Sequence, residues 1–347
     1  MAKEKYDTLV FCGRFQPFHN AHKAVIDAAL EQAKEVVIVV GSSFQPRSTK
    51  NPFTFNERKA MIESAYSLRS DIHPSRIKIV GVMDYPYDDN AWVSAVQSAV
   101  NGIKTGTKAG LIGHSKDSSS YYLNIFPDWR DHVEVANVDG INATDIREDL
   151  FSDERFFMSA DKMHLSTRHE LDSILLKGDW FPSLKVEYNQ IKEYREKSQM
   201  KGFNFPSVFV TTDAVITQSG YVLLIKRGGF PFKDCWALPG GYLDKGKFIV
   251  ENMIKELREE TKLKVPDKVL KGSIKAVEVF DHPDRDPRGR VITHGFHIDL
   301  GYPDEKLPKV KGSDDAKHAE WVKLSDVTSE MMAFDHYHII KRFIPTY

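Results

Sequence analysis

Short apolar runs alternate with helix-like patterns over the first 150 residues. The runs have the length of strands, and between them apolar residues recur every three or four positions, as on one face of a helix. Such alternation is typical of a parallel sheet covered by helices on both faces. We therefore expect a doubly wound α/β domain whose binding loops follow the carboxyl ends of its strands. The pattern predicts strands at 9–12, 36–40, 77–82, 111–112 and 133–138, and helices at 19–33, 55–66 and 90–100.

The pattern changes after about residue 155. Residues 185–201 are highly charged, helix-prone and weakly apolar. They predict a helical connector that is packed on one side, with a solvated helix inside either domain as the alternative. From Val208 onward, β-rich runs surround one long helical segment at 247–262, which predicts an α+β domain with a mixed sheet. The expected organisation is an N-terminal domain over 1–180, a helical linker over 181–205 and a C-terminal domain over 206–347.

Composition narrows the class of protein. A chain of 347 residues with 41% hydrophobic and 28% charged residues suits two globular domains. Lys and Arg (48) nearly balance Asp and Glu (49), so neither nucleic-acid binding nor a membrane-surface role is expected. The sequence has no signal-peptide core and no apolar run long enough to span a membrane, which predicts a cytoplasmic protein. Cys12 and Cys235 lack metal-ligand spacing, and the sequence leaves open whether they form a disulfide. It also leaves open whether the chain forms a homo-oligomer.

The first predicted strand leads directly into GRFQPFHNAH, residues 13–22, and then into a helix. Gly13 lacks a Cβ, so a nucleotide can approach the backbone closely there. His19 and His22 lie three positions apart at the helix start, on one face beside backbone N–H groups. A helix start attracts phosphate, and two imidazoles there can stabilise charge that develops on a transferring phosphate. We therefore predict that His19 and His22 are catalytic.

This segment resembles the HxGH nucleotidyltransferase superfamily, and GRFQPFH resembles in particular the archaeal-type nicotinamide mononucleotide (NMN) adenylyltransferases. Ala21 stands where that family usually has glycine. Segments 50–62, 88–92, 113–122 and 142–147 resemble later motifs of the family in the same order. The resemblance implies a Rossmann-like fold and in-line attack by the NMN phosphate on the α-phosphorus of ATP, with Mg²⁺ neutralising the triphosphate. It also implies that ATP and NMN are bound by Gly13, Arg14, Phe15, Trp92, His114, Lys116, Asp117, Thr144 and Arg147.

A second cluster of candidate residues follows the glycine-rich segment WALPGG at 236–241. On a helix over 247–262, Glu256, Glu259 and Glu260 fall within an arc of roughly 100°. Val250, Ile254 and Leu257 gather on a different side, which suits burial. Three carboxylates on one face favour a hard cation, Mg²⁺ or Mn²⁺. The alternative is a solvated acidic face paired with Lys and Arg along the helix.

The segment from Gly241 resembles the Nudix box, and the resemblance implies that Glu256, Glu259 and Glu260 are catalytic and bind the metal. Three lysines depart from the family pattern. Lys247 stands where the family has Glu, Lys255 where it has Arg and Lys262 where it has Gly. Residues 280–294 resemble a segment of ADP-ribose-directed Nudix proteins. The residues implied to bind ADP-ribose are Gly240, Gly241, Phe280, Arg288 and Arg290.

The two domains together resemble bifunctional adenylyltransferase/Nudix proteins. That resemblance implies synthesis of NAD from NMN and ATP, and Mg²⁺-dependent hydrolysis of ADP-ribose to AMP and ribose 5-phosphate. The ligands it implies are therefore small molecules: ATP, NMN, NAD and ADP-ribose. The three lysines favour an alternative, a Nudix-fold sensor that binds ADP-ribose or NAD without cleaving it. A further alternative is that the N-terminal domain uses another phosphate acceptor, against which Trp92 and residues 114–117 argue.

Overall fold

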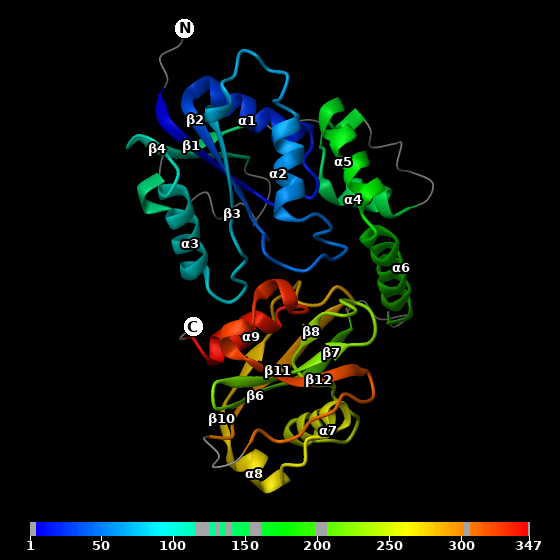
Figure 1. The fold of residues 1–347 in the computed structure, drawn as a ribbon. Coiled ribbons are helices and arrows are strands. Elements are labelled where there is room, and N and C mark those ends of the chain that lie inside the picture. Colours follow the sequence, from blue (N-terminus) through cyan, green and yellow to red (C-terminus); the bar gives the residue numbers. More distant parts are fainter. Residues whose placement is uncertain are drawn as a thin grey trace. The chain divides into compact units, whose positions relative to one another are not determined.

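The chain folds as two compact units, Met1–Lys185 and Val186–Tyr347, each built around its own sheet (Figure 1). The computed structural model describes residues 5–114, 125–129, 132–135, 140–152, 161–198, 207–301 and 306–345. In these ranges no helix has the length and apolar character needed to cross a membrane. Cys12 and Cys235 are both free thiols.

The first unit contains a parallel sheet of five strands in the order β3-β2-β1-β4-β5. The chain builds one side of the sheet and then returns to build the other, so the switch point lies between β1 and β4. The last residues of neighbouring strands are in register, with Gly13 opposite Val40 and Val40 opposite Gly81. Loops that follow these strands therefore meet at one edge of the sheet. The strands are β1 (Tyr6–Gly13), β2 (Ala33–Val40), β3 (Ile77–Gly81), β4 (Ala109–Gly113) and β5 (His132–Glu134).

Helices cover both faces of this sheet. Leu9 and Phe11 of β1 join one hydrophobic cluster with residues of α1 and α2, whereas Val10 joins a second cluster with Val96 and Val100 of α3. Alternate strand residues thus point into separate cores, as expected for a parallel sheet buried on both sides. The predicted doubly wound α/β fold is confirmed. The helices are α1 (Asn20–Gln32), α2 (Phe55–Ser64), α3 (Asp89–Asn101), α4 (Ala143–Phe151) and α5 (Leu165–Lys177), with 3₁₀ turns at Pro74–Arg76 and Pro127–Trp129.

One continuous helix, α6 (Trp180–Ser198), passes from the first unit into the second. It begins five residues before the predicted helical segment. Leu184, Glu187 and Ile191 are buried and Tyr194 is half-buried, while most residues between them are exposed. This spacing of three or four residues places the less exposed side chains on one side of the helix.

The second unit has a mixed sheet in the order β10-β11-β6-β7-β12, with β8 paired to β7 and β9 to β6. Strands β6 and β11 run parallel, and the other neighbours are antiparallel. The α+β prediction for this part is therefore confirmed. The strands are β6 (Val208–Gln218), β7 (Tyr221–Arg227), β8 (Trp236–Ala237), β9 (Gly240–Tyr242), β10 (Ile274–Phe280), β11 (Arg290–Asp299) and β12 (Ala316–Lys323), with 3₁₀ turns at Leu324–Asp326 and Ser329–Met331.

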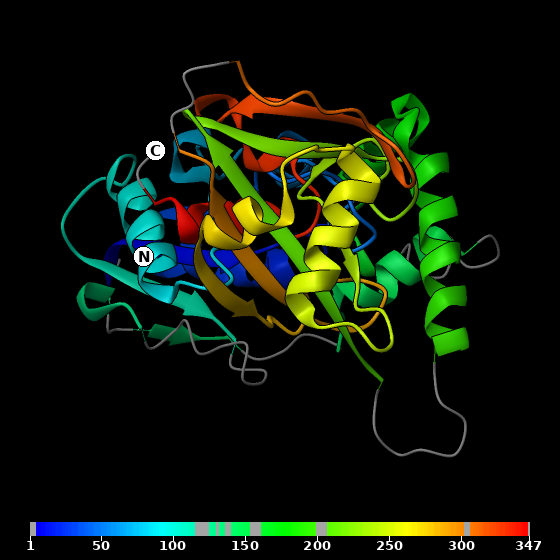
Figure 2. The ribbon, with the colours of Figure 1, turned by 90° about the horizontal axis from the view of Figure 1, so that it is seen from below.

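Helix α7 (Ile249–Thr261) lies across the strands of this sheet (Figure 2). Its Met253, Ile254 and Leu257 pack on Ala214 and Leu223 of the sheet, so the apolar side predicted from the sequence is the buried one. The helix ends at Lys262, whose φ of 53° is left-handed. Glycine adopts this conformation at least cost, which accounts for glycine in the resembling family. The remaining helices are α8 (Asp267–Gly272) and α9 (His336–Phe343).

Candidate active sites

The loop after β1 is anchored by two buried side chains. The Gln16 side chain donates to the Phe53 carbonyl at 2.8 Å and accepts from the Phe53 N–H at 3.0 Å. The Arg58 guanidinium on α2 donates to the carbonyl oxygens of Arg14 and Gly41, each at 2.7 Å, and of Ser42 at 3.1 Å. Burial lowers the pKa of Arg58 to about 10. Arg58 thus ties together the chain segments that leave β1 and β2.

His19 and His22 lie where this loop enters α1. His19 is the N-cap residue and is only 3% exposed. The two imidazole rings stack, with centroids 3.6 Å apart and planes 20° from parallel. The rings of Phe15 and Phe18 lie 4.8 Å and 5.9 Å from that of His22. Apolar packing therefore holds both imidazoles at a helix N-terminus, where an anion is favoured.

Helix α4 brings a further cation to the same loop. Arg147 donates to the Gln16 carbonyl at 2.7 Å and to the Thr144 hydroxyl at 3.2 Å. Burial, and then the positive charge of Arg14, lower the pKa of Arg147 to about 10. Two guanidinium groups that repel each other beside a helix N-terminus form a suitable setting for phosphate.

Two further predicted residues follow other strands of the sheet. Trp92 lies in the first turn of α3, with its ring 5.8 Å from that of Phe126. His114 follows β4, and its Nδ1 is 3.1 Å from the Val135 carbonyl. Because a carbonyl only accepts, this Nδ1 carries the hydrogen. Lys116 and Asp117 lie outside the described residues.

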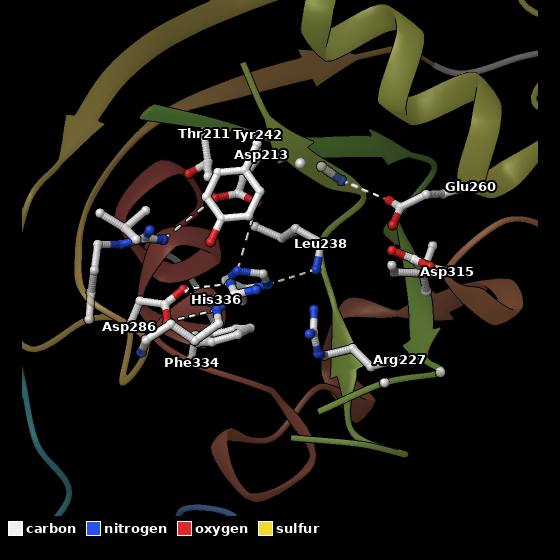
Figure 3. A pocket seen from close by; sticks show the side chains of 18 of the residues that line it. Thr211, Asp213, Arg227, Leu238, Tyr242, Glu260, Asp286, Asp315, Phe334 and His336 are labelled. Carbon is white, nitrogen blue, oxygen red and sulfur yellow. Dashed lines mark hydrogen bonds and ion pairs between the residues drawn. The ribbon is translucent and has the colours of Figure 1, made fainter. Parts of the chain in front are cut away.

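The second unit contains a pocket of about 220 Å³ beside the Leu238–Gly241 segment (Figure 3). Gly240 and Gly241 form part of its wall. A Cβ on Gly240 would collide with the Thr212 carbonyl oxygen, so this position accepts no larger residue without a shift. The pocket is lined by Thr211, Asp213, Ile225, Arg227, Gly228, Gly229, Phe230, Leu238, Gly240, Gly241, Tyr242, Glu260, Arg285, Asp286, Arg288, Val291, Asp315, Phe334 and His336.

Two carboxylates of α7 approach the two glycines. Glu260 accepts the N–H of Gly240 at 2.8 Å and is 6% exposed. Glu256 lies against Gly241, where an added Cβ would be 2.5 Å from its Oε2. Burial raises the pKa of Glu256 and raises that of Glu260 to about 8, and the charge of Glu256 adds to the latter effect. A cation bound between them would relieve this repulsion.

Lys255 lies among the neighbouring acids. Its Nζ is 3.0 Å from Asp244, 3.0 Å from Glu256 and 3.2 Å from Glu259. Lys247 is 3.4 Å from the same Asp244. Lys255 therefore links the loop before α7 to the helix. Within the described part of the chain, no three His, Cys, Asp or Glu side chains are grouped so as to hold a metal ion.

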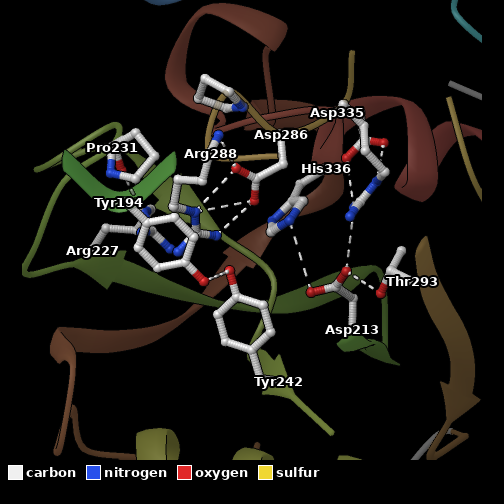
Figure 4. A network of polar contacts seen from close by, with 12 residues as sticks. Tyr194, Asp213, Arg227, Pro231, Tyr242, Asp286, Arg288, Thr293, Asp335 and His336 are labelled. Carbon is white, nitrogen blue, oxygen red and sulfur yellow. Dashed lines mark hydrogen bonds and ion pairs between the residues drawn. The ribbon is translucent and has the colours of Figure 1, made fainter. Parts of the chain in front are cut away.

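A buried network centred on Asp213 forms part of the pocket wall (Figure 4). Asp213 accepts from the Thr293 hydroxyl at 2.7 Å and lies 3.5 Å from Arg285 and 3.8 Å from His336. Arg285 donates twice to Asp335, both at 2.9 Å. His336 accepts the N–H of Leu238 at its Nδ1, at 2.9 Å, and burial lowers its pKa. The neutral imidazole therefore fixes the start of the glycine loop.

Two protein families match this chain. The family described as cytidylyltransferase-like matches residues 10–226, and the NUDIX domain matches residues 208–343. The chain belongs to the cytidylyltransferase-like family and carries a NUDIX domain.

Several relatives align with this chain over most of their own length. A nicotinamide/nicotinic acid mononucleotide adenylyltransferase of Acinetobacter baylyi is 45% identical over 146 residues, which is 42% of this chain and 75% of that protein. An ADP-ribose pyrophosphatase of Methanocaldococcus jannaschii is 37% identical over 170 residues, or 49% and 88%. A solved bifunctional NMN adenylyltransferase/ADP ribose pyrophosphatase from Francisella tularensis, complexed with AMP and a Mn ion, is 32% identical with a TM-score of 0.88 and covers 98% of this chain and 99% of its own.

In the cytidylyltransferase-like unit, most of the predicted residues gather around the loop after β1. Trp92 and His114 follow other strands of the same sheet. In the NUDIX domain, Gly240, Gly241, Glu260 and Arg288 line the pocket and Glu256 lies beside it. The residues gathered at the loop after β1 are Gly13, Arg14, Phe15, His19, His22, Thr144 and Arg147.

Besides Glu256, three predicted residues of the NUDIX domain do not line the pocket. Phe280 is 2% exposed and packs on Phe343, because it is the last, inward-facing residue of β10. Arg290 donates to the Asp281 carbonyl and lies near that residue's carboxylate. Glu259 is 42% exposed and pairs with Lys255.

Sequence reasoning missed much of the pocket wall. Asp213 lies within an apolar strand, which is a signal for a buried functional or structural carboxylate. Arg227 is the last residue of β7. Arg285 and Asp286 lie in segment 280–294, from which only Phe280, Arg288 and Arg290 are predicted to bind ligand. No local pattern points to the remaining ones. The pocket residues not predicted include Asp213, Arg227, Tyr242, Arg285, Asp286, Phe334 and His336.

Proposed function

We propose that this chain is a bifunctional enzyme of NAD metabolism. Its first unit transfers the adenylyl group of ATP to NMN, giving NAD and pyrophosphate, and its NUDIX domain hydrolyses ADP-ribose to AMP and ribose 5-phosphate. The observation that carries the proposal is the match of the whole chain, both units together, to the bifunctional protein of Francisella tularensis.

In the adenylyl transfer, an NMN phosphate oxygen forms the new bond to the α-phosphorus of ATP as the bond to pyrophosphate breaks. His19 and His22, stacked at the start of α1, stabilise the charge that develops on the α-phosphate. Arg14, Thr144 and Arg147 hold the triphosphate, and Trp92 and His114 contact the NMN side. Mg²⁺, when bound with ATP, neutralises the charge of the triphosphate.

In the hydrolysis, water adds to one phosphorus of ADP-ribose and the bond to the bridging oxygen breaks. Glu256 and Glu260, which already repel each other beside Gly240 and Gly241, are the residues that would hold a divalent cation. Such a cation supplies charge neutralisation and lowers the pKa of bound water. Arg227 and Arg288 hold the diphosphate, and the buried network around Asp213 keeps the glycine loop in place.

The test is a product assay on the full chain with Mg²⁺ and, separately, Mn²⁺. We expect NAD and pyrophosphate from NMN plus ATP, and AMP plus ribose 5-phosphate from ADP-ribose, both detected by chromatography. Omission of the metal, or addition of EDTA, serves as the control and abolishes both products. Adenylylation of another acceptor in place of NMN would overturn the first assignment.

The placement of Lys255 favours a second candidate for the NUDIX domain, an ADP-ribose sensor. A cation already pairs with Glu256 and Glu259, so part of the carboxylate charge is neutralised within the protein. Tight ADP-ribose binding without release of AMP in the presence of either metal would support the sensor and contradict hydrolysis.

A further inference from the structure

Residues 187–195 of α6 pack on loops that carry lining residues of the NUDIX pocket. Glu187 accepts the N–H of Phe232 at 2.9 Å, and Arg195 donates to the carbonyl of Pro287 at 2.8 Å. Both partners belong to loops that flank pocket residues, Phe230 on one side and Asp286 and Arg288 on the other. This stretch of the helix therefore packs on the segments that carry the pocket's cations.

Tyr194 lies between these two contacts of α6. Its hydroxyl donates to the hydroxyl of Tyr242 at 3.1 Å (Figure 4). The rings of both tyrosines also pack on Phe209, at 6.2 Å and 5.8 Å. Burial raises the pKa of Tyr242, so its phenol stays neutral. Tyr242 lines the pocket directly after Gly241, whereas Tyr194 stands one layer behind it.

The rings of Tyr194, Tyr242 and Phe334 lie around the guanidinium of Arg288. The guanidinium lies 5.4 Å from the Tyr242 ring, 5.9 Å from the Tyr194 ring and 5.6 Å from the Phe334 ring. Asp286 accepts from its Nε at 3.0 Å and its Nη2 at 2.6 Å. This pairing uses one edge of the guanidinium, so Nη1 is the nitrogen left to meet a ligand oxygen in the pocket.

The charge pattern indicates the class of ligand. Arg227 lines the same pocket, and burial followed by the positive charge of Arg288 lowers its pKa. Both guanidinium groups are half-buried and face one pocket, and among the described residues Asp286 pairs only with Arg288, so an anion that binds between them is favoured. A diphosphate group carries enough negative charge to neutralise both.

We propose that Tyr194 is a positioning residue of the NUDIX pocket: through Tyr242 and its own ring, it holds Arg288 in place to bind the diphosphate of the substrate. The helix that leads out of the cytidylyltransferase-like unit is then part of the second substrate site. The identity of the substrate as ADP-ribose rests on the proposed function, but the anion chemistry does not.

The test compares Tyr194→Phe and Tyr194→Ala in the full chain, with Glu196→Gln as a control on an exposed position of the same helix. Dissociation constants are measured by calorimetry in EDTA for ADP-ribose and for inorganic pyrophosphate, and hydrolysis of ADP-ribose is measured with Mg²⁺. The pyrophosphate titrations use an added Arg147→Ala substitution, which weakens pyrophosphate binding to the first unit. For Tyr194→Ala we expect both dissociation constants and the KM to rise about tenfold, with kcat changed less than about threefold. Tyr194→Phe, which keeps the ring, should show a smaller rise, and Glu196→Gln none. NAD formation by the same samples, unchanged in all three, shows that the chain is folded.

Two results would overturn the proposal. One is wild-type affinity of Tyr194→Ala for both ligands, and the other is a fall in kcat with KM unchanged. If the wild-type chain binds pyrophosphate but not ADP-ribose, the proposed function fails, and the pyrophosphate constants of the variants still decide the role of Tyr194. If the wild-type chain binds neither ligand, the anion site itself is refuted.

Discussion

Lys255 of α7 stands where the resembling family has arginine and lies among three carboxylates. Arginine, the family residue, would hold the loop before α7 through its planar fork. Lysine instead places one ammonium group between Asp244, Glu256 and Glu259, within 3.2 Å of each. Hydrogen bonds to Glu256 and Asp244 raise its pKa, so it stays charged. The link between loop and helix therefore survives the substitution.

The role of Lys255 can be tested by charge-retaining and charge-removing variants. Lys255→Arg keeps the cation, and we expect its kcat for ADP-ribose hydrolysis to stay within about threefold of the wild-type value. Lys255→Gln leaves Glu256 and Glu259 without this counter-ion, and kcat should fall about tenfold or more because the loop loses its link to α7. Equal rates for Lys255→Gln and the wild type would show that the link does not matter for turnover.

The stacked histidines are expected to act in the transition state of adenylyl transfer. His19→Ala and His22→Ala should each lower kcat for NAD formation about 100-fold or more, while the dissociation constants for ATP and NMN change much less. Steady-state kinetics combined with equilibrium binding separates the two effects. Weaker binding at unchanged kcat would contradict the assigned role, and ADP-ribose hydrolysis by the same samples controls for folding.

At the scale of elements, most strands and helices follow from local patterns, but their ends do not. The apolar runs of β1 and β2 and the apolar side of α7 are visible in the sequence because burial repeats at a fixed period. The start of α6 at Trp180 is not, since Pro182 reads as a helix breaker. Pro182 lies in the first turn of α6, where its missing N–H breaks no helical hydrogen bond.

Glu187 of α6 makes the stability of the second unit depend on pH. Burial raises its pKa from about 4.5 to about 6, and among the described residues its Oε1 has no hydrogen-bond partner. Between these values the folded chain binds more protons than the unfolded chain, so stability falls as pH rises from about 4.5 to about 6 and stays lower above that.

Replacing Glu187 by glutamine should remove this dependence. Glutamine keeps an oxygen for the N–H of Phe232 and carries no charge. We expect Glu187→Gln to stabilise the unit by about 1–2 kcal/mol at pH 7.5, with no gain near pH 4.5. Urea unfolding at both pH values measures this, with the exposed Glu193→Gln as a control on the same helix. A variant that is less stable than the wild type at pH 7.5 would contradict the account.

At the scale of the whole molecule, the two candidate sites differ in how far the sequence revealed them. The first is built largely from one contiguous loop and the start of α1, so its motif stands in the sequence as it stands in the fold. The NUDIX pocket takes Asp213 from β6, Glu260 from α7, Arg288 from the loop before β11 and His336 from α9. Only the folded chain brings such distant residues together, so the sequence pointed to Gly240, Gly241, Glu260 and Arg288 and missed the other lining residues.

In the proposed function, one chain carries two independent active sites. The most direct measurement assays both reactions on the same full-length samples of His22→Ala and Glu260→Gln, the latter chosen because glutamine can still accept the N–H of Gly240. We predict that His22→Ala loses NAD formation but hydrolyses ADP-ribose at the wild-type rate, and that Glu260→Gln shows the reverse, each loss being about 100-fold or more. Loss of both reactions in either folded variant, or of neither, would contradict two separate sites.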